Sequence, residues 1–221
     1  MNQEFLDAAT GGDVSKIRTM LQANPSLARA RDENGVSAIM KATYYGKKDV
    51  VAALLESEVE LDVFEAAATG QTSRLLDLIT KDVSLANAHS PDGFTPLGFA
   101  VFFGQPEIVK ALLQVGADVN IPSRESMKVT PLASAAAAKQ TDIARLLIEH
   151  GANVNARAAS NHIPLHEAAG NGNVELVKLL IENGADVNAR TDDGKTPMDF
   201  AIEYKRDEVV ELLGKLCGCS E

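Results

Sequence analysis

Cysteine and tryptophan are scarce in this chain of 221 residues. It contains no Trp, and its two Cys, Cys217 and Cys219, both lie beside the C-terminus. Two thiols so close to one end cannot cross-link a fold, which fits a reducing compartment, and they are too few for a closed zinc site. We interpret the pair as incidental, with metal capture, lipidation and redox chemistry as alternatives, although the ending CGCSE does not match a prenylation box.

Basic runs and long apolar runs are also missing. Lys and Arg number 21 against 31 Asp and Glu, which gives a formal net charge of −10. Without clustered basic residues the chain is poorly suited to bind the phosphates of nucleic acids. No apolar run reaches about 18 residues, and MNQEFLDAAT lacks the features of a signal peptide. We therefore expect no nucleic-acid partner, no membrane partner and a cytoplasmic location.

No group of residues in the sequence suits catalysis. The segments GDVSK and GNGNVE do not form a phosphate-binding loop, because their Gly residues are better explained as helix ends. His162 and His166 are four residues apart, but Pro164 lies between them, which disfavours a metal site on one helix. We expect no enzyme activity, no metal and no cofactor.

What the chain does contain is a segment repeated at nearly fixed spacing. Four TPL-like starts place their prolines 35, 33 and 33 residues apart, at Pro96, Pro131, Pro164 and Pro197. The turn positions eight residues after these prolines are 104, 139, 172 and 205. Similar turn positions continue towards the N-terminus at residues 70, 46 and 12. A period near 33 indicates stacked structural units.

The sequence of each unit predicts two short helices joined by a turn. In the fourth unit, Thr95 can cap the first helix, Pro96 suits its first turn, and Gly104 ends it at φ > 0. The segment PEIVKALLQV then predicts an amphipathic second helix, which Gly116 ends. Helices this short are marginal alone, so we expect each pair to be stabilised by its neighbours.

These motifs resemble ankyrin repeats: TPLxxA at Thr95 and Thr130, IPLHEAA at Ile163, and GADVN at Gly116 and Gly184. The resemblance implies an all-α ankyrin-repeat solenoid of about seven stacked helix-turn-helix repeats with projecting β-hairpin or loop fingers. We expect one domain over 1–221, with repeats at about 3–34, 35–60, 61–92, 93–127, 128–160, 161–193 and 194–217, the first and last acting as caps. The SLA-containing variants in the first and third units resemble bacterial ankyrin proteins.

Several positions depart from the family pattern. The 24-residue step between Gly46 and Gly70 indicates that the second repeat lacks its finger, with helices at 48–57 and 62–69 joined by a tight connection. The missing finger is either neutral or forms a notch in the binding surface. Two extra residues at 121–129 lengthen another loop, which either contacts the partner or is a neutral insertion. Lys139 and Lys205 replace the turn Gly, so we expect those turns to be distorted.

The resemblance further implies a protein partner and a concave groove that binds it. Aromatic residues make up only 5% of the chain, and most fall at positions that face this groove in the family. Exposed rings are typical of interface hot spots. We expect a groove centred on repeats two to four, anchored by Tyr44, Tyr45, Phe94, Phe102 and Phe103. Alternatively, the rings pack on neighbouring repeats.

Further positions complete the expected site. Phe99 and Phe200 should be half-exposed, and Glu167, Asn171 and Tyr204 should lie further along the groove. There the groove becomes flat and acidic, which suits a partner with an apolar end and a basic end. His166 occupies the family's PLH position, which implies a structural hydrogen bond, although Ile163 removes the usual hydroxyl beside it.

From these features we expect a monomeric protein–protein interaction module with an unidentified partner. Binding would use a preformed surface with a low reorganisation cost. Two alternatives remain at this point, a dedicated regulatory inhibitor of a specific enzyme or toxin and a secreted effector directed at a host cell.

Overall fold

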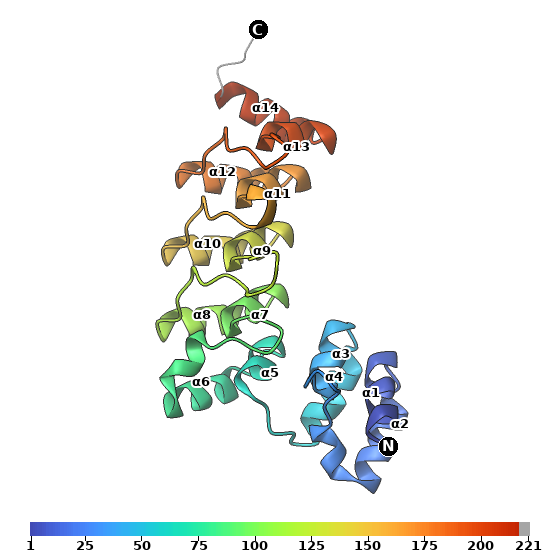
Figure 1. Ribbon diagram of the computed structural model, residues 1–221. Coiled ribbons are helices and arrows are strands. Elements are labelled where there is room, and N and C mark those ends of the chain that lie inside the picture. Colours follow the sequence, from blue (N-terminus) through green and yellow to red (C-terminus); the bar gives the residue numbers. More distant parts are fainter. Residues whose placement is uncertain (217–221) are drawn as a thin grey trace. The chain divides into compact units, whose positions relative to one another are not determined.

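The computed structural model describes residues 1–216, and Cys217 and Cys219 lie outside this range. The described residues form fourteen α-helices and three 3-10 helices without a β-strand, and only an isolated bridge joins Arg31 to Ser37 (Figure 1). The prediction of an all-α fold is confirmed.

The α-helices form seven consecutive pairs: α1 (Asn2–Gly11) and α2 (Val14–Ala23), α3 (Ala38–Tyr44) and α4 (Lys48–Glu56), α5 (Val63–Ala68) and α6 (Thr72–Lys81), α7 (Pro96–Phe102) and α8 (Pro106–Gln114), α9 (Pro131–Ala137) and α10 (Thr141–Glu149), α11 (Pro164–Asn171) and α12 (Val174–Glu182), α13 (Pro197–Glu203) and α14 (Asp207–Leu216).

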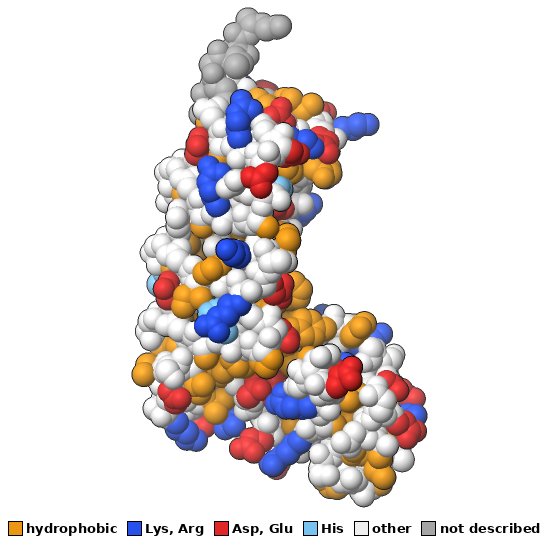
Figure 2. Space-filling view, in the orientation of Figure 1, with side chains coloured by type: hydrophobic (Ala, Val, Ile, Leu, Met, Phe, Trp, Pro, Cys, Tyr) orange, Lys and Arg blue, Asp and Glu red, His pale blue; other side chains and the backbone are white. Residues whose placement is uncertain are grey.

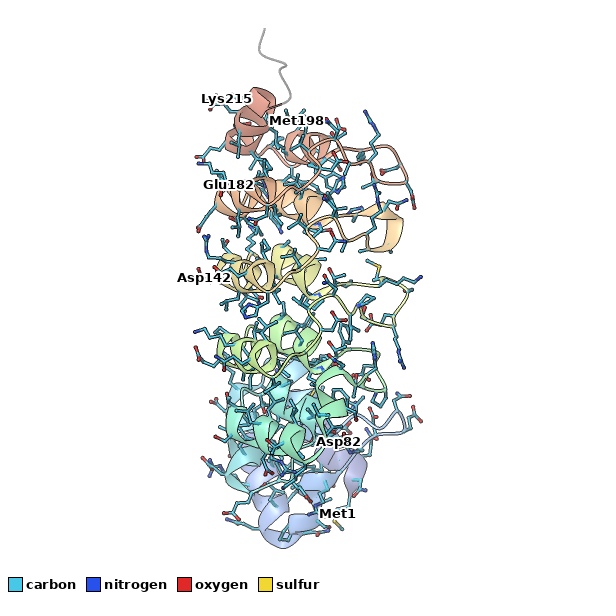
Figure 3. All side chains as sticks on the ribbon, turned by 90° about the vertical axis from the view of Figure 1, so that its left-hand side faces the viewer. Met1, Asp82, Asp142, Glu182, Met198 and Lys215 are labelled. Atoms are coloured by element: carbon cyan, nitrogen blue, oxygen red, sulfur yellow. The ribbon has the colours of Figure 1, made fainter. Side chains whose placement is uncertain are left out.

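The chain divides into two compact units, Met1–Leu85 and Ala86–Glu221. In the first unit α1 packs on α3 and α3 on α5, while α2 packs on α4. In the second unit α7, α9, α11 and α13 stack as an inner layer, and α8, α10, α12 and α14 stack as an outer layer. Figure 3 views the second unit from its outer layer, where side chains fill the space between successive helices.

The inner helices of the second unit begin as their sequence predicts. The Thr95 hydroxyl oxygen accepts a hydrogen bond from the Gly98 amide at 3.0 Å, and Pro96 occupies the first turn of α7. Thr130 caps α9 in the same way. The leucine of each TPL start is buried, with Leu97 only 1% exposed, so the cap fixes the helix that carries a core side chain.

The turns at Lys139 and Lys205 keep the regular geometry. Lys139 has φ 58° where Gly104 has φ 64°, and Lys205 has φ 56°. The Gln140 amide donates to the Ala135 carbonyl at 2.9 Å, as the amide after Gly104 donates to its own helix at 2.8 Å. The prediction that these turns are distorted is wrong, because the two lysines adopt the left-handed conformation that the turn requires.

Two kinds of hydrogen bond join the loops of successive repeats in the second unit. On the side of the outer helices, the Asn120 side chain accepts from the Asn153 amide at 2.8 Å and donates to the Gly151 carbonyl at 3.1 Å. Asn155 bridges to the next loop in the same way. At the opposite ends of these loops, a backbone amide of one loop donates to a backbone carbonyl of the preceding loop. The three pairs are Arg124 N to Gly93 O, Ala159 N to Met127 O and Asp192 N to Ser160 O.

The connection between α4 and α5 is short. The helices lie within one residue of their predicted bounds and are joined by residues 57–62. Arg31 forms ion pairs with Asp62 at 3.2 Å and with the buried Glu65 at 3.0 Å. Beside this connection lies a cleft of about 350 Å³ whose lining includes Arg29 and Arg74. Within the first unit, charged side chains thus line the position where the sequence predicted a missing finger.

Candidate protein-binding surface

Four phenylalanines of the second unit form an aromatic cluster, which we define as Phe94, Phe99, Phe102 and Phe103. The capped start of α7 places Phe94 just before the helix and the other three along it or at its end. The Phe102 and Phe103 ring centroids lie 5.0 Å apart in an edge-to-face arrangement, and Phe94 lies 6.3 Å from Phe102. These contacts hold the rings in place.

The cluster members differ in their exposure. Phe102 is 53% exposed, and Phe94 and Phe103 are half-buried. Phe99 is only 1% exposed, with its ring 5.3 Å from that of Phe94. The expectation that Phe99 is half-exposed is wrong, because its side chain packs beneath Phe94 and Phe103 as part of the core. We therefore remove Phe99 from the candidate surface.

Two further aromatic residues of the predicted site lie in the first unit. Tyr44 is 39% exposed at the end of α3, and Tyr45 is 62% exposed at its C-cap. They are neighbours in sequence and present two rings at one end of a single helix. The aromatic cluster belongs to the other unit, so we consider these tyrosines as a separate candidate surface.

A second group of rings lies around α13. Phe200 is half-buried, with its ring edge-to-face with those of His162 at 5.2 Å and His166 at 5.3 Å. Tyr204 is 52% exposed, and Lys195 pairs with Glu203 at 2.7 Å. Here aromatic and charged side chains alternate, in contrast to the purely aromatic cluster on α7.

Asn171 has a structural role that the sequence did not suggest. Its side-chain amide donates hydrogen bonds to the carbonyls of Ala136 at 3.2 Å and Ala137 at 3.0 Å. These carbonyls lie in the last turn of α9, where they lack the regular helical partner, and Ala136 O also accepts from the Lys139 amide at 3.2 Å. Asn171 therefore ties α11 to α9, and its contact with a partner stays a prediction.

His166 makes the structural hydrogen bonds that its position implies, despite the loss of the neighbouring hydroxyl. Its Nδ1 accepts from the Ile163 amide at 3.1 Å, and its Nε2 lies 3.2 Å from the Ala189 carbonyl and 3.3 Å from the Lys195 carbonyl. A neutral ring with the proton on Nε2 satisfies all three contacts. Burial lowers the pKa of His166 below its ordinary value, which favours this neutral form.

A pocket of about 310 Å³ lies between the loop that precedes α9, residues 115–130, and the loop that precedes α11, residues 150–163, which we call finger loops. Its walls are mainly apolar and include Val129, Ala133, Ala137 and Ile163. Glu167 contributes a carboxylate, whose Oε1 lies 3.1 Å from His162 Nδ1. Glu167 thus lies in a half-buried position beside an apolar pocket. Its contact with a partner stays a prediction.

Sequence reasoning missed this pocket, although a signal was present. Small side chains recur at four-residue spacing from Val129 through Ala133 to Ala137, where the preceding repeat has Phe94, Gly98 and Phe102. Replacing two aromatic rings by smaller side chains at equivalent positions leaves space unless a neighbour fills it. The finger loop before α11 encloses this space, and it comes from a different repeat.

Charges on the face shown in Figure 2 are mixed, with Lys and Arg interspersed among Asp and Glu over the helices of the second unit. No helix among residues 1–216 is long and apolar enough to cross a membrane.

Known proteins resemble this chain over its repeats. A family model for ankyrin repeats in three copies matches residues 63–158 and 155–220. The ankyrin repeat protein YahD of Escherichia coli K12 is 29% identical over 165 residues, which cover 67% of this chain and 80% of YahD. This similarity agrees with the predicted resemblance to bacterial ankyrin proteins.

Eukaryotic relatives share a smaller part of their length. DNA-binding protein RFXANK of Homo sapiens is 37% identical over 84 residues, which cover 38% of this chain and 32% of RFXANK. E3 ubiquitin-protein ligase KEG of Arabidopsis thaliana is 35% identical over 155 residues, which cover 65% of this chain but 9% of KEG. The chain thus spans a third or less of these two relatives. Since the family model covers more than half of the chain and the paired helices follow its motifs, this chain belongs to the ankyrin-repeat family.

Proposed function

We propose that this chain is a protein–protein interaction module, and that its second unit binds a partner on the exposed part of the aromatic cluster. Ankyrin repeats are general protein-interaction modules, which supports a protein as the partner. The observation that carries the proposal is Phe102, a large apolar side chain that is 53% exposed within a group of rings. Grouped exposed rings are unfavourable in water and favourable under a partner.

The geometry of the rings supports a low cost of binding. Phe102 contacts Phe94 and Phe103 at centroid distances of 6.3 and 5.0 Å, so its ring is already ordered by its neighbours. A side chain that is ordered in the unbound protein loses little conformational freedom when a partner covers it. An apolar side chain of the partner placed against Phe102 would extend the edge-to-face packing that the cluster already uses.

In this proposal the module acts as a monomer in the cytoplasm, on a protein and not on nucleic acid or a membrane. The net charge of −10 supports this choice, because phosphate groups would be repelled. The same charge favours partners whose contact surface is neutral or basic.

A capture experiment tests the role of the aromatic cluster. The wild-type chain and a Phe102→Ala/Phe103→Ala variant are immobilised, and bound proteins are identified by mass spectrometry and then measured by calorimetry. We expect the double variant to lose about 1–4 kcal/mol of binding free energy. Its melting temperature should fall only modestly, because Phe102 is more than half exposed and Phe103, which stacks on Phe99, is half-buried.

Val115→Ala is the matched control, since Val115 is an exposed apolar residue of the same repeat at the end of its outer helix. This variant should bind the captured partner as the wild type does. Unchanged affinity in the double variant, together with a collapse of its melting temperature, would show that the two rings belong to the core. A single stoichiometric partner would identify an inhibitor, whereas several weak partners would identify a scaffold.

A further inference from the structure

We infer that the pocket between the finger loops before α9 and α11 accepts a long cationic side chain of the partner, an arginine or a lysine. Its alkyl stem would lie against the apolar walls, and its charged group would bind the Glu167 carboxylate. This inference rests on the proposed function as a protein-binding module, but it concerns a different part of the second unit from the aromatic cluster.

The pocket exists because one repeat has small residues where its neighbour has rings. In the fourth repeat Phe94 lies over Gly98, whose added β-carbon would meet the Phe94 ring at 3.6 Å, and Phe102 packs beside it. The equivalent positions of the fifth repeat are Val129, Ala133 and Ala137. The volume of about 310 Å³ is at the lower end of the range of about 300–1,000 Å³ for ligand sites. The space is therefore large enough for one long side chain.

The rim of the pocket is held in place by the backbone. The Ala159 amide of one finger loop donates to the Met127 carbonyl of the other at 2.9 Å. Lys128, Ser160 and Asn161 adopt φ of 47°, 56° and 59° beside the pocket. The left-handed conformation costs about 1 kcal/mol or more at a residue with a β-carbon, so the surrounding contacts must maintain it. The pocket is preformed by these constraints.

The charge in the pocket selects the occupant. The Glu167 side chain is 38% exposed, and its Oε1 is the atom that contacts His162. Its Oε2 makes no hydrogen bond or ion pair within residues 1–216. A guanidinium or ammonium group could bind this second oxygen by a charge-assisted hydrogen bond, while the partly buried position limits screening by water.

The walls complement the rest of such a side chain. Arginine and lysine bury their alkyl stems along apolar surface while the charged end stays near water. Val129, Ala137 and Ile163 offer that surface, and Met127, which is 54% exposed, offers a flexible thioether at the entrance. A shorter aliphatic side chain would fill the hollow but would leave the second carboxylate oxygen without a partner.

Small probes test the pocket without the partner. Nα-acetyl-arginine amide is titrated into the isotope-labelled full chain, and the backbone amide signals of Ala159 and Glu167 are followed by nuclear magnetic resonance. Nα-acetyl-citrulline amide has the same shape without the charge, and Nα-acetyl-leucine amide has only an aliphatic side chain. We expect saturable shifts with the arginine probe and about tenfold weaker binding of the other two probes.

Variants of the chain locate the contact. Glu167→Gln keeps the size of the side chain but removes its charge, and it should weaken the arginine probe about tenfold without affecting the leucine probe. Ala137→Phe restores the ring of the preceding repeat and should block all probes. Ala138→Phe, one residue further and outside the pocket lining, should leave the binding of the arginine probe unchanged.

Two results would overturn the inference. Equal binding of the arginine and leucine probes, unaffected by Glu167→Gln, would show a simple apolar pocket. No shift of either amide with any probe would show that the hollow is not a binding site. Both readouts are independent of partner capture, so failure of the pocket and failure of the aromatic cluster can be distinguished.

Discussion

At the scale of single residues, Lys139 and Lys205 carry backbone strain that the fold maintains. Each holds a positive φ at a turn where other repeats have glycine, and each keeps the regular turn hydrogen bonds. For a residue with a β-carbon this conformation costs about 1 kcal/mol or more. The two lysines therefore reduce the stability of the folded chain relative to glycine at the same positions.

Lys139→Gly should increase the free energy of unfolding by about 0.5–1 kcal/mol. The gain from relieving the turn exceeds the added freedom of glycine in the unfolded chain by this margin. Urea unfolding followed by circular dichroism measures the change. Lys139→Ala retains a β-carbon at φ 58° and should give no gain, so equal stabilisation by both variants would contradict the explanation.

His166 should make the protein less stable in mild acid. Its pKa is lowered, mainly by burial, from an ordinary value of 6.5. Below pH 6.5 the unfolded chain takes up a proton more readily than the folded chain, so stability is complete above this pH and falls as the pH drops towards the folded pKa. The loss is at most about 1.4 kcal/mol per pH unit.

Urea midpoints measured between about pH 7.5 and pH 5 test this slope. His166→Gln should be less stable by about 1–3 kcal/mol and should lose the His166 contribution to the slope. The exposed His150 provides the control, and His150→Gln should keep the slope of the wild type. An unchanged slope in His166→Gln would show that another group is responsible.

At the scale of the elements, Arg31 stabilises the point where the connection between α4 and α5 enters α5. Arg31 contacts Asp62, which caps α5, and Glu65, which completes the capping box and is 2% exposed. The carboxylate of Glu65 is thus buried beside a single guanidinium. This arrangement stabilises the short connection of residues 57–62.

Arg31→Ala should cost about 1–3 kcal/mol of stability, because it leaves the buried Glu65 carboxylate without its cation. The cost stays below that of a fully buried pair, since the Arg31 side chain is 44% exposed. Arg29→Ala removes the exposed pair with Glu60 and should cost less than about 1 kcal/mol. Thermal unfolding of both variants makes the comparison, and equal losses would argue against a special role for Arg31.

The elements themselves could be predicted from local chemistry. Thr95 and Pro96 specify where α7 begins and Gly104 where its turn lies, because these effects involve only neighbouring residues. The burial of Phe99 could not be predicted, since it depends on how the rings of Phe94 and Phe103 fold over it. The pocket beside Glu167 was missed for a related reason, because its walls come from two repeats.

At the scale of the whole molecule, regular bridges connect successive repeats of the second unit. Asn120 and Asn155 each use both side-chain groups to join their own loop to the next one. The 33-residue period predicts that such neighbours stack, but it carries no information on the division of the chain near residue 85. That division reflects how residues contact one another within each unit, which a repeat period does not describe.

Asn120→Ala should reduce the free energy of unfolding by about 1–3 kcal/mol, because it removes two hydrogen bonds between repeats. Asn188 occupies the equivalent position in a later repeat and is exposed, and its side chain makes no hydrogen bond within the described part of the chain. Asn188→Ala should therefore change stability by less than about 0.5 kcal/mol. Urea unfolding of both variants tests whether the bridge or the residue type matters.

The backbone pairs between finger loops have a consequence for how new specificity could arise. The bonds Arg124 N to Gly93 O, Ala159 N to Met127 O and Asp192 N to Ser160 O involve main-chain atoms alone. Side chains at exposed positions of these loops can therefore be exchanged without breaking these three main-chain bonds, whereas the Asn161 side chain itself joins its loop to Asp192. A combinatorial library that randomises exposed positions such as Glu125 and Met127, but not Lys128 with its positive φ, would keep its scaffold while sampling new recognition chemistries.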